Sequence, residues 1–250
     1  MMRDAPGYLS ENEARCIMIA AALAPAEGVN MEIGSFKGRS TIGLAHICKR
    51  YELGVVVAVD PHTAPSVTDP DLKGKSSTLN EFRTNVNRAG LTDYIDTRVM
   101  KSAELARKWN EPIRFLWIDG DHTYEGAKAD VELFKPYLVP GAILLMHDVL
   151  GTHYGSLRVF AEDVLGSDDF GPAGYCGSIG WVQYRPLDGD SLRFQIKRRL
   201  LAIPARQIIP VAKSPHGLEG WNKLRYKIWR PLAPHGRMTP QKLWSQIRGV

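Results

Sequence analysis

Short apolar runs alternate with longer amphipathic stretches along most of the chain. Each run ends in glycine or polar residues, which is typical of buried strands in a parallel sheet. The stretches between them place apolar residues at helical spacing, as Ala127, Val131, Phe134 and Leu138 do. This alternation predicts an α/β fold, with a mostly parallel sheet and helices on both of its faces. We expect strands at residues 29–33, 55–59, 95–100, 115–118 and 142–146, and a late antiparallel strand at 178–184.

Capping and stop signals mark where the helices begin and end. Ser10 and Glu13 form a capping-box pattern ahead of the first helical stretch, and Gly90 is a natural stop for another. The segment 61–77 is polar and rich in proline, which predicts a loop over the sheet edge and a candidate lid that includes His62. We expect helices at residues 14–23, 38–50, 79–89, 124–138 and 154–165.

The C-terminal part of the chain is strongly basic. Residues 186–250 hold 13 Lys and Arg against 3 Asp and Glu, whereas the first 185 residues hold 19 against 24. Such a tail suits nucleic acid, anionic lipid or an acidic partner, or it is a solvated extension. We expect helices in it at residues 192–201 and 221–229, and otherwise an irregular appendage. The chain then divides into a helical lead-in (1–28), an α/β domain (29–186) and a basic C-terminal extension (187–250).

Composition argues against several classes of protein. With 250 residues, 44% apolar and 24% charged, the chain is ordinary for one large globular α/β domain with extensions. The longest apolar stretch, residues 16–25, is too short to span a bilayer, and the N-terminus lacks a secretory signal pattern. The three cysteines are widely spaced, which favours reduced thiols in a cytoplasmic protein over a thiolate zinc site or a redox dithiol.

Candidate chemistry gathers at the ends of two predicted strands. Asp119, Asp121 and His122 follow one of them, and His147 and Asp148 follow the other. The carboxyl ends of parallel strands lie at one edge of the sheet, where ligands bind in open α/β folds. Carboxylates there, as at Asp119 and Asp148, suit a hard divalent cation. An imidazole, with an ordinary pKa of about 6.5, suits a general base at neutral pH.

The first two strand ends carry a different pattern. Gly34 and Gly38 bracket a turn in which the backbone can approach a ligand closely, and the following helix offers free N–H groups to an anion. Ser35 and Ser40 are candidate donors, although the segment taken alone also fits a simple strand-to-helix turn. Its spacing is Gly-x-x-x-Gly, not the Gly-x-Gly-x-x-Gly of dinucleotide enzymes. Asp60, after the second strand, suits the two hydroxyls of an unphosphorylated ribose, or it caps a turn.

Four segments, in this order and spacing, resemble the class I S-adenosylmethionine-dependent methyltransferases. Within them the chain is similar to the metal-dependent O-methyltransferases of macrolide sugars, and more distantly to the catechol O-methyltransferases. The resemblance covers residues 32–184 and implies a Rossmann-like methyltransferase fold with a seven-stranded sheet, to which the basic extension has no counterpart. The segments are Glu32-Ile-Gly-Ser-Phe-Lys-Gly-Arg-Ser-Thr41, Val59-Asp60-Pro61, Ile118-Asp-Gly-Asp-His-Thr-Tyr124, and Leu138-Val-Pro-Gly141 leading to His147-Asp148-Val149.

The resemblance implies which residues bind the cofactor. The glycine turn would contact the methionine part of S-adenosylmethionine, Asp60 the ribose, and Ser102 would lie near the adenine. The residues implied in cofactor binding are Glu32, Gly34, Ser35, Gly38, Ser40, Asp60, Ser102 and Asp119.

The resemblance also implies a metal site and a base. Asp119, His147 and Asp148 would hold Mg²⁺ or Mn²⁺, while a cofactor contact or a helix cap remains the alternative for Asp119. Relatives often carry an acid in place of His147, and a histidine there favours softer metals such as Mn²⁺ or does not ligate at all. His122 lies at the spacing of the base in the macrolide-sugar enzymes, with Asp121 as its competitor.

The function implied is methyl transfer to a hydroxyl of a sugar or glycoside, with a mannose- or deoxyhexose-type acceptor. A catechol-like or other small hydroxylated metabolite is the alternative acceptor, and a non-catalytic cofactor-binding module is the alternative function. Tyr124, His153 and Tyr154 flank the segments expected to line the acceptor pocket, and the tail tryptophans are further candidates. We also expect a homo-oligomer, because Trp and Arg in the tail suit an interface.

Two other enzyme classes are disfavoured by missing motifs. A nicotinamide-dependent oxidoreductase is disfavoured because the chain lacks the Gly-x-Gly-x-x-Gly turn. A nucleic-acid methyltransferase that acts on base amines typically carries Asn/Asp-Pro-Pro-Tyr after the fourth strand. This chain has Asp119-Gly-Asp-His122 there, which suits oxygen chemistry.

Overall fold

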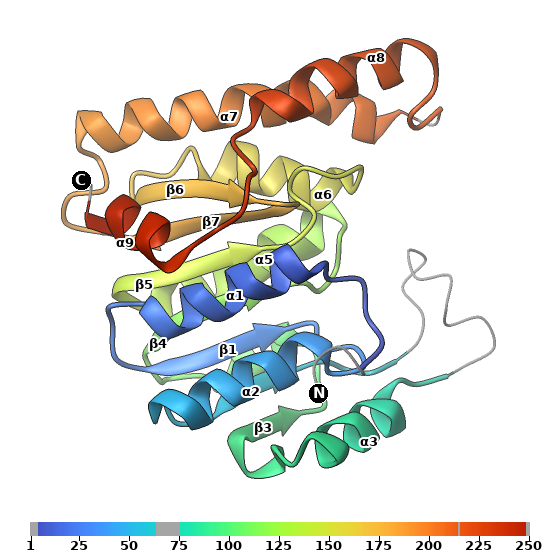
Figure 1. Ribbon diagram of the computed structural model, residues 1–250, viewed down its shortest axis with the longest axis vertical. Coiled ribbons are helices and arrows are strands. Elements are labelled where there is room, and N and C mark those ends of the chain that lie inside the picture. The colour runs from blue at the N-terminus through green and yellow to red at the C-terminus, as the bar shows by residue number, and fades with distance from the viewer. Residues whose placement is uncertain (1–4, 64–75, 215, 249–250) are drawn as a thin grey trace.

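The computed structural model describes residues 5–63, 76–214 and 216–248. The strands in these residues are β1 (Val29–Ile33), β2 (Val56–Val59), β3 (Ile95–Arg98), β4 (Ile113–Ile118), β5 (Leu138–Met146), β6 (Phe170–Cys176) and β7 (Ile179–Tyr184). They form a seven-stranded sheet in the order β3-β2-β1-β4-β5-β7-β6 (Figure 1). β1 to β5 are parallel, whereas β7 is antiparallel to both β5 and β6.

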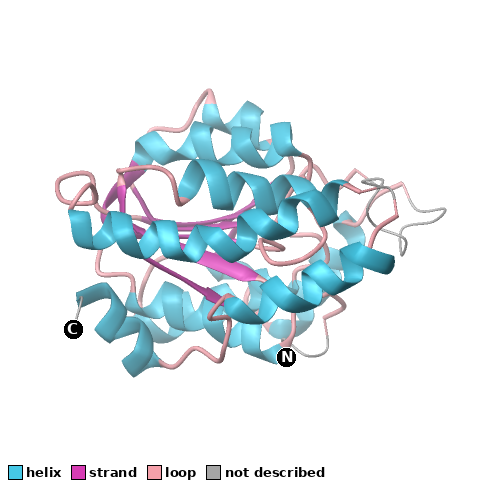
Figure 2. Ribbon diagram, turned by 90° about the horizontal axis from the view of Figure 1, so that it is seen from above, coloured by secondary structure: helices cyan, strands magenta, loops and turns pink. Residues whose placement is uncertain are grey.

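Helices cover both faces of this sheet (Figure 2). They are α1 (Glu11–Leu23), α2 (Arg39–Tyr51), α3 (Leu79–Ala89), α4 (Ser102–Ala106), α5 (Tyr124–Phe134), α6 (Tyr154–Arg158), α7 (Leu192–Lys213), α8 (Gly220–Trp229) and α9 (Pro240–Arg248). One apolar core lies between the sheet and α1, α2, α3 and α9, and a second between the sheet and α4, α5, α6 and α7. The predicted α/β architecture with helices on both faces is therefore confirmed.

Most predicted elements begin and end within a few residues of the observed ones. The capping box at Ser10 and Glu13 is present, and Gly90 ends α3 in the left-handed conformation. The stripe of Ala127, Val131 and Phe134 on α5 is buried, but that helix ends at Phe134, and Leu138 already belongs to β5. α6 is shorter than predicted, because a π-helical turn replaces regular helix over Val159–Val164.

One strand, β6, was missing from the sequence prediction. Its sequence contains Gly171, Pro172 and Gly174, which resemble turn residues. β6 is the edge strand of the sheet, where a proline is tolerated because no neighbour needs its N–H. Gly174 leaves room for a buried indole, since a Cβ at this position would lie 2.8 Å from Nε1 of Trp181.

The expectation of an irregular tail was wrong. α7 continues past Pro204 and Pro210 to Lys213, well beyond the predicted end at residue 201. Its inner face, which includes Phe194 and Ile208, is buried in the core, so packing outweighs the backbone hydrogen bonds that the prolines remove. α9 returns across the opposite face of the sheet and contacts α1. No helix within the described residues is long and apolar enough to cross a membrane.

A buried arginine fixes α7 to the sheet. Arg198 is 1% exposed, and its guanidinium donates hydrogen bonds to the carbonyls of Leu165, Phe170 and Gly189. It also forms a 3.1 Å ion pair with Asp168. Removing these donors would leave buried carbonyl groups without partners, which is costly.

We therefore expect Arg198→Met to lower the free energy of unfolding by roughly 2–4 kcal/mol. Urea denaturation followed by circular dichroism measures this change. Arg199→Met is the matched control, because Arg199 is the next residue on the same helix and is exposed. Equal stabilities of the two variants would contradict the anchoring role of Arg198.

Candidate active site

The backbone positions the site residues by continuing the sheet ladder past the strand ends. Gly34, Asp119 and His147 each donate a backbone hydrogen bond of 2.8–3.0 Å to the carbonyl of the last residue in the neighbouring strand. The three residues therefore lie side by side at the carboxyl edge of the sheet. The prediction that these strand ends meet is confirmed.

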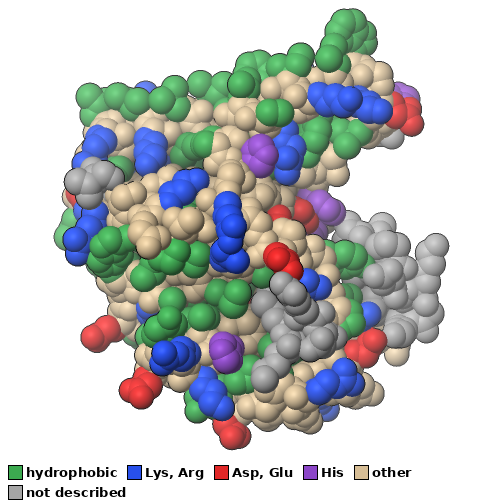
Figure 3. All heavy atoms as spheres, viewed as in Figure 1, with side chains coloured by type: hydrophobic (Ala, Val, Ile, Leu, Met, Phe, Trp, Pro, Cys, Tyr) green, Lys and Arg blue, Asp and Glu red, His purple; other side chains and the backbone are tan. Residues whose placement is uncertain are grey.

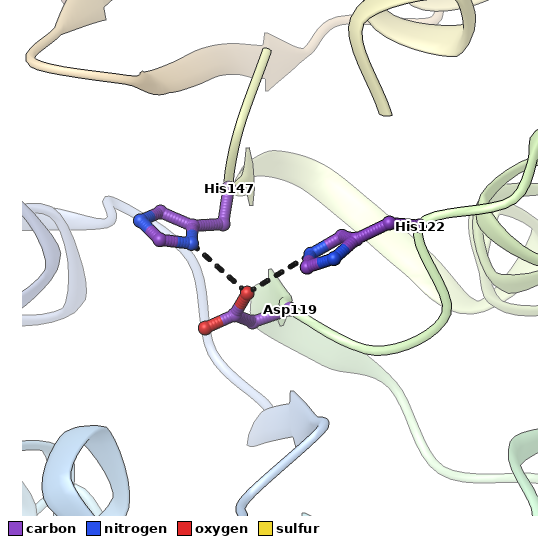
Figure 4. A group of neighbouring side chains, drawn as sticks. All are labelled: Asp119, His122 and His147. Atoms are coloured by element: carbon purple, nitrogen blue, oxygen red, sulfur yellow. Dashed lines mark hydrogen bonds and ion pairs between the residues drawn. The ribbon is translucent and has the colours of Figure 1, made fainter. Parts of the chain in front are cut away.

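Asp119 lies between two imidazoles (Figure 4). Its Oδ1 is 3.0 Å from Nδ1 of His147 and 3.5 Å from Nε2 of His122. These three ligand atoms all lie within 4.8 Å of one another, a spacing that a single cation can bridge. His147 is buried and packs against Trp117, whereas His122 is partly exposed.

Asp148 extends this cluster toward His153. Its Oδ2 lies 3.4 Å from Nε2 of His153, 3.5 Å from Nδ1 of His147 and 3.7 Å from Nε2 of His122. Asp148 has a positive φ of 56°, a backbone conformation that Asp tolerates better than most residues and that is often found at functional sites. The structure thus brings together four predicted residues, Asp119, His122, His147 and Asp148. It adds His153, which the sequence had placed only near the acceptor pocket.

The charges of the cluster shift the pKa values of its members. Burial opposes charge on Asp119, but the positive charges of His147 and His122 and the hydrogen bond with His147 hold the pKa of Asp119 well below its usual range. Burial also opposes charge on His147, yet Asp119 and Asp148 raise the pKa of His147 to about 9. The pKa of His122 is raised for the same reason. Burial lowers the pKa of His153, and Asp148 only partly offsets this effect.

The glycine turn after β1 lies directly beside Asp119. Gly34 has a φ of 89°, and a Cβ on it would lie 2.1 Å from the carbonyl oxygen of Asp119, so no larger residue fits. Gly38, with a φ of 88°, begins α2. Asp60 holds the turn in place, since its Oδ2 accepts a 2.8 Å hydrogen bond from the backbone N–H of Phe36. Its Oδ1 accepts another, of 2.6 Å, from the N–H of His62.

Two buried polar groups, one at the end of β1 and one in this turn, are incompletely paired. Glu32 is fully buried and accepts a hydrogen bond from Thr41, but its Oε1 has no partner within the described parts of the chain. Burial raises the pKa of Glu32 to about 8, although hydrogen bonds from Ser40 and Thr41 oppose the shift. The hydroxyl of Ser35 is also buried and without a partner among those residues. Orphaned polar atoms beside a glycine turn are what a bound polar ligand would satisfy.

We expect Gly34→Ala to weaken binding of S-adenosylhomocysteine at least about tenfold, because the turn must shift to relieve the contact with Asp119. Titration calorimetry measures the affinity. Gly54→Ala is the matched control, because Gly54 also has a positive φ of 74° but open space around its Cα. Wild-type affinity in Gly34→Ala would contradict a close approach of the ligand to this turn.

Several predicted site residues have other partners in the structure. The carboxylate of Asp121 accepts a 2.8 Å hydrogen bond from the N–H of Thr123 and lies against Gly126 on α5. The hydroxyl of Ser102 donates to Asp130 at 2.5 Å. Neither residue belongs to the cluster around Asp119. The predicted roles of Asp121 as a base and Ser102 near the adenine stay predictions.

The predicted acceptor-lining tyrosines contact α6 and the π-helical turn after it. The Tyr154 hydroxyl accepts a hydrogen bond from Arg158, and the Tyr124 hydroxyl lies 3.3 Å from Asp163. His62 is buried and hydrogen bonded to Thr78, so it anchors one end of the predicted lid. Most of that lid, residues 64–75, lies outside the described residues.

Two features of the site were missed in the sequence. Glu13 was identified only as a helix cap, but its Oε1 also accepts hydrogen bonds from the N–H and hydroxyl of Ser178 and lies 4.0 Å from Nε2 of His147. The second feature is a contact between the C-terminal extension and the segment after β5, in which Tyr226 and Arg230 both donate hydrogen bonds to the carbonyl of Leu150. No local sequence signal marks either contact, since each joins residues far apart in the chain.

Comparison with known proteins agrees with the fold. Residues 31–149 match a family described as a methyltransferase domain. Cofactor-bound Rv0187 from MTB superposes with a TM-score of 0.56 and 18% identity, over 73% of this chain and 84% of that chain. The O-methyltransferase TomG from Streptomyces achromogenes in complex with SAM superposes with a TM-score of 0.55 and 15% identity, over 71% of this chain and 82% of that chain. The O-methyltransferase from Bacillus cereus in complex with SAH superposes with a TM-score of 0.54 and 20% identity, over 72% of this chain and 85% of that chain. At these identities the likeness establishes a shared fold.

Proposed function

We propose that this chain is a class I methyltransferase, because residues 31–149 match a methyltransferase domain and the sheet has the fold shared with the compared enzymes. It transfers the methyl group of S-adenosylmethionine to a hydroxyl oxygen of a sugar or glycoside, assisted by a divalent cation. One observation carries this proposal. Asp119, Asp148 and three imidazoles converge at the carboxyl edge of the sheet, directly beside the glycine turn.

The residues of the glycine turn fit the cofactor. The unpaired Oε1 of Glu32 and the hydroxyl of Ser35 are available to its polar amino-acid part, and Gly34 leaves the space that a Cβ would fill. Asp60 retains lone pairs for ribose hydroxyls in addition to the two backbone hydrogen bonds it accepts. When bound, the cofactor supplies a sulfonium methyl group that needs no further activation.

The donor set of the cluster fits a divalent cation. Asp119 and Asp148 offer carboxylate oxygens, and His147 offers an imidazole nitrogen that faces both of them. Mixed oxygen and nitrogen ligands favour Mn²⁺ more than Mg²⁺. When bound, the cation lowers the pKa of an acceptor hydroxyl and orients its oxygen.

His122 is suited to take the proton from that hydroxyl. Its Nε2 faces Asp119 and Asp148 but makes no hydrogen bond among the described residues. The two carboxylates stabilise the imidazolium that forms when His122 accepts a proton, as the raised pKa of His122 indicates. Asp121 is turned toward Thr123 and Gly126, which favours His122 over Asp121 as the base.

A polar acceptor with several hydroxyls fits the outer side of the cluster. His122, Asp148 and His153 lie there, and all three are partly exposed. Figure 3 shows that this side of the molecule is hollowed beneath α8. Convergent hydrogen-bonding groups suit a sugar better than a flat catechol, and the rings of Tyr124 and Tyr154 already have Arg158 over them.

The test is methyl transfer from labelled S-adenosylmethionine to a panel of monosaccharides, glycosides and catechols. We expect transfer to a glycoside, loss of transfer with EDTA, and recovery when Mn²⁺ or Mg²⁺ is returned. Transfer that survives EDTA would reassign Asp119 and Asp148 to cofactor or acceptor binding. Transfer only to catechols would overturn the acceptor class.

A further inference from the structure

The outer surface of the tail helices carries an exposed apolar ridge. The ridge consists of Leu192, Ile196, Leu200 and Ile203 on α7 and Trp221, Leu224 and Ile228 on α8. Figure 3 shows hydrophobic side chains along the upper edge of the molecule, over both helices. Trp221 is 85% exposed, Leu192 70% and Leu200 62%, which is unusual for side chains of this size on one surface.

The spacing of the ridge residues gives each helix an apolar face that is exposed instead of buried. On α7 the buried side, with Phe194, Ala205 and Ile208, packs on the sheet, and the ridge lies on the opposite side. On α8, Trp221, Leu224 and Ile228 are spaced three and four residues apart and share one face. The two helices pack together through Arg225, which donates to Gln207. The ridge is therefore one surface held by folded elements.

Cations border the ridge, and acids are missing from it. Arg199 and Arg206 on α7 and Lys223 and Lys227 on α8 are all exposed. Neither α7 nor α8 contains an Asp or Glu in its sequence. Two copies of this surface facing each other would bring like charges together, which disfavours a second copy of the chain as the occupant. Nucleic acid is disfavoured by the apolar ridge, which offers nothing to phosphates.

We propose that the apolar ridge docks the protein on a membrane surface rich in anionic lipids. Helices with an apolar face bordered by Lys and Arg lie in the plane of the interface, and an exposed tryptophan is typical of that depth. The cations attract the lipid headgroups, and the apolar residues enter the boundary with the acyl chains.

Docking in this way would place the active site near the lipid headgroups. α8 borders the site, because Tyr226 on α8 and Arg230 after it both donate to the carbonyl of Leu150, two residues after Asp148. The docking surface itself contains no residue of the cluster around Asp119. Membrane docking is thus independent of methyl transfer, and an experiment can contradict either proposal without contradicting the other.

Vesicle co-sedimentation of the full-length chain, without cofactor or acceptor, tests the proposal. We expect binding to vesicles of equal parts phosphatidylcholine and phosphatidylglycerol, weakening as salt is raised, and little binding to phosphatidylcholine alone. Trp221→Ser combined with Leu200→Ser, and separately Arg199→Glu combined with Arg206→Glu, should each weaken binding at least about tenfold.

Two control variants match these changes away from the ridge. Tyr51→Ser removes an exposed aromatic residue from α2, and Arg88→Glu combined with Arg107→Glu makes the same change in net charge near α3 and α4. Both should bind vesicles like the wild type, and circular dichroism should show that all variants are folded. No binding to anionic vesicles, equal loss in the controls, or a wild-type dimer in light scattering that the Trp221 and Leu200 changes dissociate would overturn the proposal.

Discussion

Asp119→Asn is expected to lower methyl transfer by about 10³-fold or more. Asp119 lies closer than Asp148 to both His122 and His147, and asparagine keeps its shape but removes its charge. Turnover in a labelled-methyl assay measures this effect, and calorimetry with S-adenosylhomocysteine shows how much of it comes from cofactor binding.

The same substitution has a spectroscopic consequence. In the metal-free protein the charge of Asp119 contributes to raising the pKa of His147 to about 9, so Asp119→Asn should lower that pKa. An NMR titration of the imidazole protons detects the change. Asp93→Asn is the control, because Asp93 is an exposed acid in the turn before β3. Full activity of Asp119→Asn, or an unchanged titration of His147, would contradict the account of the cluster.

His122→Gln is expected to lower turnover by about 10²–10⁴-fold, the range for loss of a general base. A base must be neutral before it accepts a proton, so wild-type activity should rise with pH until His122 has lost its proton. The variant should lack this rise, because glutamine does not titrate. Initial rates measured across the pH range, at saturating cofactor, show both effects.

Asp121→Asn discriminates between the two candidate bases. The side chain of Asp121 caps the turn before α5, and asparagine can still accept the hydrogen bond from Thr123. We expect this variant to keep most of the wild-type activity. An inactive Asp121→Asn beside an active His122→Gln would show that Asp121 is the base.

Patterns within short segments predicted much of this molecule. The order of strands and helices follows from apolar periodicity, and the capping box at Ser10 and Glu13 locates α1. The edge of the sheet that carries the site follows from where polar residues end the strands, since parallel strands place Asp119 and His147 side by side.

What could not be predicted depends on contacts between distant segments. β6 resembles a turn because Gly171, Pro172 and Gly174 are rare in strands. The edge position of β6 explains Pro172, and the side chains of Arg185 and Trp181 explain Gly171 and Gly174. The length of α7 depends on packing against the sheet, which overrides Pro204. The link from Glu13 to His147 joins the first helix to the fifth strand, so no local pattern contains it.

The most direct test of the central claim is the position of the transferred methyl group. We would incubate the protein with S-adenosylmethionine labelled with ¹³C at its methyl group and with a panel of glycosides, and locate the label in the product by NMR. The account predicts a methyl ether on a glycoside oxygen with wild-type protein and none with Asp119→Asn. A label on nitrogen or carbon, or the same product from Asp119→Asn, would contradict it.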